Sequence, residues 1–186
     1  MFKLKEDIGE SLDRINFIYK NQKILTECIK DFKGFTIFKE KLGPYQKGKS
    51  YKLKFFLAIP LIKNNILKIA PEDKFDNRDA QRYAISERDD LKLKELESKY
   101  FLNKIKEFKL FMKKAVNIGE KPKTDLDRFN SYNANIIDSR LLKLLRLSTT
   151  ELSPSDEQRL TNSEKILISN ISELINIWRN YYLNQN

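Results

Sequence analysis

Apolar side chains follow two different periods in the first part of the chain. Residues 4–20 place them at every third or fourth position, which predicts a short amphipathic helix. From about residue 22 to 70 the period is closer to two, and the segments ILTECIKDF, FTIFKEKL and SYKLKFF predict short strands. FLAIPLIKNN predicts a short helix that Pro60 forces to begin late or to kink, and ILKI predicts a returning strand. We therefore expect residues 1–72 to form a small β-rich domain with an N-terminal helix.

After Pro71 the pattern is helical to the end of the chain. Residues 89–116 predict one long helix, which Gly119 and Pro122 end, and residues 125–148 predict a second. The apolar positions that line up on this second helix are Leu126, Phe129, Ile137, Leu141, Leu144 and Leu145. Long amphipathic helices of this kind are expected to pack into one bundle.

A last helix completes the pattern. Ser153, Pro154 and Asp156 offer an N-cap, an N1 proline and a capping-box acid, so we expect a helix to begin there and to run on through residue 183. One side of it carries Leu167, Ile171, Leu174, Trp178 and Tyr182. The predicted fold class is therefore α+β: a mainly α-helical bundle domain, residues 73–186, preceded by the small β-rich domain.

The composition of the 186 residues removes much of ordinary enzyme chemistry. The chain has no His and a single Cys28, so it lacks the usual general base, the commonest metal ligand and any internal disulfide. We predict no catalytic residue, no cofactor and no metal. No apolar run of 18 residues exists and the N-terminus is highly charged, so we expect an intracellular, soluble protein without a membrane segment.

The net charge of +10 raises the question of nucleic acid. Residues 1–75 hold 16 basic and 9 acidic side chains, so most of the excess lies there. Because 27 of the 36 basic residues are Lys and only 9 are Arg, sequence-specific reading of DNA bases is not expected. Weak DNA contact through four lysines remains an alternative to a merely solvated, Lys-rich surface; they are Lys47, Lys49, Lys52 and Lys54.

Residues 43–50, GPYQKGKS, fit the P-loop pattern of nucleotide-binding proteins. A working P-loop follows a buried strand and opens a helix, whereas the residues after Ser50 alternate like a strand. Pro44 also lacks an N–H, and the loop is bulky where phosphate must approach closely. We therefore interpret the segment as a turn and keep a P-loop phosphotransferase as an alternative hypothesis.

The same stretch carries a family resemblance. LGPYQKGKSYKLKFFLAIPLIKNNILKI, followed by Pro71, resembles the part of GINS subunits in which a Gly-Pro-aromatic turn and a short strand precede a leucine-alanine helix and a strand ending near a proline. KYFLNKIKEFKLFMKKA looks like the family's aromatic-rich first long helix. IIDSRLLKLLR looks like its D-x-R-x-x-K helix, carried by Asp138, Arg140 and Lys143. The order, with the β module first, is that of the "two-three" branch of archaeal and eukaryotic GINS subunits.

This resemblance implies a non-enzymatic scaffold of DNA replication. GINS subunits assemble in fours, in archaea typically two copies each of two related chains. The implied partners are a paralogous subunit of the "one-five" branch in a 2:2 heterotetramer, the MCM helicase, a RecJ-like protein and, as a further candidate, primase. The implied location is the archaeal cytoplasm, at replication forks on the nucleoid, with weak or indirect DNA contact.

The candidate partner interface consists of two groups of residues. Ile171, Leu174, Trp178, Tyr181 and Tyr182 lie on the predicted last helix, where aromatic residues are suited either to anchor an interface or to pack in the core. Asp138, Arg140 and Lys143 are candidates to position a partner or a phosphate, with solvated or intramolecular ion pairing as the alternative. A free-standing nucleic-acid-binding protein is the main competing hypothesis to the scaffold.

Overall fold

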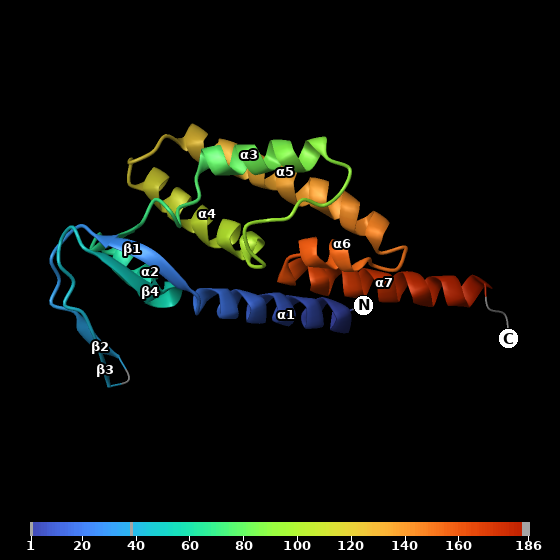
Figure 1. The fold of residues 1–186 in the computed structure, drawn as a ribbon, viewed down its shortest axis with the longest axis horizontal. Helices are drawn as coiled ribbons and strands as arrows, with labels where there is room; N and C mark the ends of the chain where they lie inside the picture. Colours follow the sequence, from blue (N-terminus) through green and yellow to red (C-terminus); the bar gives the residue numbers. More distant parts are fainter. Residues whose placement is uncertain (1, 38, 184–186) are drawn as a thin grey trace. The chain divides into compact units, whose positions relative to one another are not determined.

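The protein has an α+β fold with five short strands and seven helices among the residues that the structure describes, 2–37 and 39–183 (Figure 1). This computed structural model divides by its contacts into two compact units. Met1–Asn16 and Phe75–Asn186 form one, here called the helical unit, and Phe17–Lys74 form the other, here called the sheet unit. The first helix, α1 (Phe2–Lys20), contributes residues to both, whereas the predicted division placed it wholly in the first domain.

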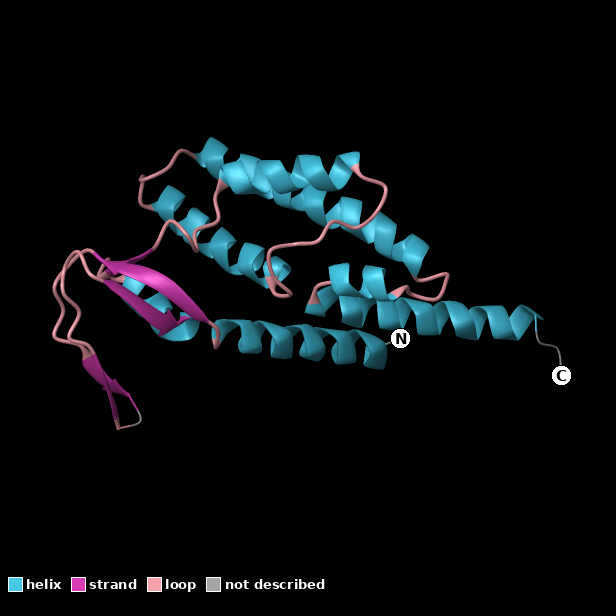
Figure 2. Cartoon of the chain, in the orientation of Figure 1, coloured by secondary structure: helices cyan, strands magenta, loops and turns pink. Residues whose placement is uncertain are grey.

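The sheet unit is built around β1 (Lys23–Cys28). This strand lies between β4 (Ser50–Lys54) and β5 (Leu67–Ile69) in a three-stranded antiparallel sheet. Figure 2 draws the strands in magenta. Burial alternates along β1, because one face packs on α2 (Phe55–Lys63) and the other is open. The buried centre of the unit contains Cys28, Tyr45, Leu61 and Leu67.

Two further strands, β2 (Phe35–Ile37) and β3 (Glu40–Leu42), form a separate antiparallel ribbon. Gly34 and Gly43 allow its base to close. Gly34 has a φ of +90°, and a Cβ at that position would lie 2.0 Å from the carbonyl oxygen of Leu42; Gly43 has a φ of +100°. Strands form within each predicted segment, but FTIFKEKL is divided between β2 and β3, and β1 and β4 end at Cys28 and Lys54, before their predicted segments end. Phe38 lies outside the described residues. The short helix is also confirmed, but it includes Pro60 and begins at Phe55, directly after β4, so the prediction of a late start is wrong.

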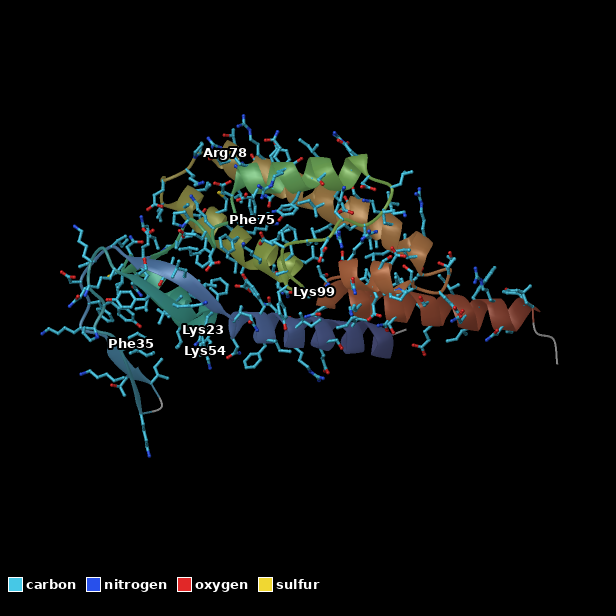
Figure 3. The ribbon with its side chains drawn as sticks, viewed as in Figure 1. Lys23, Phe35, Lys54, Phe75, Arg78 and Lys99 are labelled. Atoms are coloured by element: carbon cyan, nitrogen blue, oxygen red, sulfur yellow. The ribbon has the colours of Figure 1, made fainter. Side chains whose placement is uncertain are left out.

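The helical unit contains α3 (Asn77–Asp89), α4 (Phe101–Asn117), α5 (Lys123–Leu147), α6 (Pro154–Arg159) and α7 (Asn162–Leu183). Phe75 enters its core just before α3 (Figure 3). Its ring contacts Phe101 of α4 and Phe129 of α5 edge to face, with ring centroids 5.5 and 5.8 Å apart. A second cluster joins α5, α6 and α7 through Leu144, Leu160 and Ile168.

The helix predicted over residues 89–116 starts at Phe101 instead of residue 89. Residues 90–100 form an irregular connection in which Leu93 and Leu96 are buried. Its carbonyl groups accept hydrogen bonds from side chains of α5, which take the place of helical bonds. The helix α3 escaped prediction because its buried positions are two alanines and a charged residue, Ala80, Ala84 and Glu87, although its start carries a capping box from Asp76.

The last predicted helix is broken in two at Leu160. The N-cap Ser153 and the N1 proline are confirmed for α6. A second capping box then starts α7: Thr161 Oγ1 accepts from the backbone N–H of Glu164 at 3.3 Å, and a carboxylate oxygen of Glu164 accepts from the N–H of Thr161 at 2.8 Å. The residue types of this capping box are present in the sequence TNSE. The box allows the chain to turn without leaving these backbone groups unpaired.

Candidate functional site

Arg140, which was predicted at a partner interface, lies in the core of the helical unit with 1% of its surface exposed. Its Nε donates to one carboxylate oxygen of Glu164 at 2.5 Å and its NH2 group to the other at 2.9 Å. NH1 donates to Glu87 at 2.9 Å. The carbonyl oxygens of Lys94 and Arg159 accept from NH1 and NH2 at 3.0 and 3.1 Å. The guanidinium group is therefore satisfied on every side by this chain alone.

Lys143, one turn further along α5, is also buried. Its ammonium group donates to the carboxylate of Glu87 at 2.6 Å, to the backbone carbonyl of the same residue at 2.6 Å and to the carbonyl of Lys92 at 3.0 Å. Two cations and two carboxylates thus form a neutral cluster, here called the ion cluster: Arg140, Lys143, Glu87 and Glu164. It ties α3, the 90–100 connection, α5 and the start of α7 together.

The protonation of Arg140 follows from two opposed effects. Burial by itself lowers the pKa of the guanidinium group, because a charged group loses hydration. Hydrogen bonds and attraction from Glu164, together with those from Glu87, outweigh burial and raise the pKa above its ordinary value. Arg140 is therefore a permanent cation.

The ion cluster corrects the prediction for the D-x-R-x-x-K helix. Arg140 and Lys143 make intramolecular ion pairs, the alternative kept open from the sequence, and neither is available to a partner or a phosphate. Asp138 is exposed and lies outside the cluster. The capping-box spacing from Thr161 to Glu164 is a signal that could have located Glu164, although it was not used in the prediction. Nothing in the sequence marked Glu87 as the group that joins both cations.

The face of α5 that packs inward also differs from the predicted one. Besides the ionic pair, its buried positions include Phe129, Ile136 and Leu144. Four other apolar side chains of the helix are exposed, three of them from the predicted stripe: Ile137, Leu141, Leu142 and Leu145. Phe129 and Leu144 of the predicted stripe are confirmed on the inward face, whereas Ile137, Leu141 and Leu145 are not. Two charged residues occupy inward positions, so apolar residues alone do not mark this face.

The predicted aromatic group on α7 forms an exposed cluster at the end of the helix. Trp178, Tyr181 and Tyr182 are 65%, 78% and 60% exposed. Trp178 lies 5.1 Å and Tyr181 4.9 Å from Tyr182, measured between ring centroids. Leu174 is half exposed, and Ile171 one turn earlier is partly buried. We call these five residues the α7 stripe; Figure 1 shows this half of the helix extending past α5 and α6.

A groove runs along another side of α7. It has a volume of about 580 Å³ and lies between α7, α6 and the connection that follows α5. Leu152, Leu160 and Ile168 line it with apolar surface, and Glu157 and Lys165 form an ion pair at 2.8 Å across it. Ile177, 60% exposed, lies both in this groove and among the exposed apolar residues near the end of α7.

Residues 43–50 do not have P-loop geometry. They lead into β4 and not into a helix, and Tyr45 is buried against Phe32. The backbone N–H groups that would cradle phosphate already have acceptors. Backbone carbonyls accept from three of them: Phe32 from Tyr45, Cys28 from Gly48 and Gln46 from Lys49. Side chains accept from the other two: the Tyr51 hydroxyl from Gln46, and the Asp31 carboxylate from Lys47. The segment is the turn that the sequence favoured.

The four lysines considered for DNA contact, Lys47, Lys49, Lys52 and Lys54, are all exposed in the sheet unit. Within the described part of the chain, no group of three or more acidic or Cys side chains is arranged to hold a metal ion. The helices of that part are all too short or too polar to cross a membrane. No protein-family model matches the chain, and no curated protein matches its sequence.

Proposed function

We propose that this protein is a non-enzymatic subunit of a GINS-like replication scaffold. The elements of the sheet unit support the resemblance: the turn at Tyr45, the strand β4, the helix α2 and the strand β5 follow one another up to Pro71 in the order expected for the family. The larger helical unit continues after them, as in the "two-three" branch. Its long helices offer surface for contacts with other subunits, and a scaffold acts through such contacts.

The observation that carries the proposal is the α7 stripe. A Trp and two Tyr side chains at one helix end, all more than half exposed, form an apolar patch of the kind that marks protein interfaces. The exposed leucines of α5 belong to the same unit. A standard interface buries about 800 Å² on each partner, and large aromatic residues supply much of such an area.

The partner that we propose for this surface is a paralogous subunit of the "one-five" branch, in a 2:2 heterotetramer. The finished assembly would join the MCM helicase and a RecJ-like protein, with primase as a further candidate, at archaeal replication forks. Its mechanism is binding energy that holds a helicase in its active arrangement, so the chain itself needs no catalytic group.

The test is co-expression with a candidate "one-five" subunit, followed by light scattering of the purified species. We expect a mass near four chains. The double variant Trp178→Gln/Tyr182→Gln should lower that mass. The matched control Leu91→Gln/Leu110→Gln, which changes two exposed leucines of the same unit, should not. A monomer that ignores the partner contradicts the proposal, and so does a tetramer that survives the α7 substitutions.

A free-standing nucleic-acid-binding protein is the second candidate, because the sheet unit is strongly basic. It predicts tight binding of DNA by the chain alone at physiological salt, with no need of a second subunit. A nanomolar Kd under those conditions, from a well-behaved monomer, would favour this candidate over the scaffold.

A further inference from the structure

The positive charge of the chain is concentrated in the sheet unit. Residues 17–74 contain 13 lysines, no arginine and 5 carboxylates, a net charge of +8 out of the +10 of the whole chain. The helical unit is therefore close to electrically balanced. A unit of this size with such an excess attracts polyanions strongly at low salt.

Three lysines gather on the open face of the sheet. Directly opposite residues of an antiparallel pair project on the same face, and the register places Lys23 opposite Lys54, and Lys52 opposite Leu25. All three lysines are exposed, and Figure 3 shows Lys23 and Lys54 at the same end of the sheet. Like charges directly opposite each other are destabilising, so this arrangement weakens the sheet unless an anion lies against it.

The nearby carboxylates are already engaged. Glu27 on the same face pairs with Lys68 at 2.7 Å. Asp73 accepts from the backbone N–H of Leu25, and Asp31 from that of Lys47. Among the described side chains, no carboxylate lies within ion-pairing distance of Lys23, Lys52 or Lys54. Their charge is left for something outside the chain.

An aromatic ring lies beside one of the three lysines, Lys54. Phe56, at the start of α2, is 41% exposed, and the Lys54 ammonium lies 6.0 Å from its ring centroid. Proteins that bind single strands combine a positive track for the backbone with aromatic rings on which bases stack. Reading a duplex by its base edges relies most often on Arg, and the sheet unit has none. The combination therefore favours a single strand over a duplex.

We propose that Lys23, Lys52 and Lys54, with Phe56, form a sequence-independent binding site for single-stranded nucleic acid. The three ammonium groups contact successive phosphates, and one base stacks on the Phe56 ring. An acidic protein surface would satisfy the lysines but would leave the ring without a role. The proposal does not rest on the scaffold function, because it concerns a different unit of the chain.

The test uses the full chain and a fluorescein-labelled oligo-dT of 20 nucleotides, with binding followed by anisotropy between 50 and 200 mM NaCl. We expect a micromolar Kd at 50 mM that weakens with salt. The triple variant Lys23→Gln/Lys52→Gln/Lys54→Gln should weaken binding at least tenfold. It should also reduce the slope of log K against log salt by about 2, since each phosphate contact on a single strand contributes about 0.7.

Two further variants separate the parts of the site. The control Lys109→Gln/Lys113→Gln/Lys123→Gln removes the same charge from exposed positions of the helical unit and should leave the slope unchanged. Phe56→Leu keeps an apolar side chain at α2 but removes the stacking ring. It should weaken binding of oligo-dT about fivefold or more, with no change in slope. Circular dichroism of each variant establishes that it is folded.

Three results would overturn the proposal. One is an equal loss in the control and in the sheet variant. Another is oligo-dT binding that Phe56→Leu does not weaken. The third is competition by poly-glutamate as effective as that by unlabelled oligo-dT, which would indicate an acidic protein as the ligand. These three results concern oligonucleotide binding, whereas the scaffold proposal is tested by the mass of the complex with a second subunit. Failure of one proposal can therefore be told apart from failure of the other. If the chain is purified with its partner, the same variants are compared in the complex.

Discussion

The inward face of α5 and the outer end of α7 reverse the usual distribution of side chains. The buried face of α5 carries Arg140 and Lys143, whereas the exposed end of α7 carries Trp178 and Tyr182. Each buried cation has a full set of partners within the chain, so that region is complete by itself. The aromatic residues have neighbours only along their own helix end in the described contacts. The comparison separates the surface that the fold itself uses from the surface on which the proposed assembly depends.

The largest effect is expected from breaking the ion cluster. Arg140→Met keeps volume on α5 but leaves Glu164 without its guanidinium partner and Glu87 with one cation fewer. An uncompensated buried charge typically costs about 3–5 kcal/mol, and we expect a loss of this size in the free energy of unfolding. Urea denaturation measures it. Arg146→Met, at an exposed position of the same helix, is the control and should change stability by less than about 0.5 kcal/mol.

A small effect of Arg140→Met would contradict the view that the cluster is essential to the helical unit. Replacing all four charges by apolar residues of similar volume is a different experiment. Buried ion pairs replaced as a set are often neutral or even stabilising, because the desolvation cost disappears with the charges. The single variant is therefore the informative one, since it isolates the cost of an unpaired carboxylate.

A smaller effect is expected at the break between α6 and α7. Thr161→Ala removes the hydroxyl that accepts from the Glu164 N–H, and loss of such a cap costs about 0.5–2 kcal/mol. Because Glu164 also pairs with Arg140, the cap and the ion cluster share one residue. The effects of Thr161→Ala and Arg140→Met should therefore not be additive in a double-mutant cycle. Thr124→Ala, at an exposed position in the first turn of α5, serves as the control; strict additivity would argue against a shared network.

The sequence predicted the fold class and most elements, because spacing and capping residues are local signals. The strands around β1, the helix α5 and the start of α6 at Ser153 followed from them. Long-range contacts caused the errors. Residues 90–100 have a helical pattern, but the carbonyl oxygens of Lys92 and Lys94 accept hydrogen bonds from the side chains of Lys143 and Arg140 instead of from the backbone N–H groups of a helix.

The candidate site was also predictable only where local signals mark its residues. The α7 stripe could be located from its aromatic residues, but whether they pack inward depends on how far α5 and α6 extend along α7. The role of Arg140 depends on Glu87, which is 53 residues away in the sequence and has no local signature. The lysines of β4 were visible, whereas Lys23 joined them only through the strand register.

The smallest effect on stability is expected from substitutions in the α7 stripe, which should have the largest effect on the proposed assembly. In the chain alone, Trp178→Gln/Tyr182→Gln should change the free energy of unfolding by less than about 0.5 kcal/mol, because both rings are more than half exposed. Ile168→Ala, on the buried part of the same helix, should cost about 2–5 kcal/mol. Urea denaturation of the three proteins compares the two halves of α7 directly. A destabilisation by the double variant close to that of Ile168→Ala would mean that the rings belong to the core in solution, and it would contradict the interface proposed for the α7 stripe.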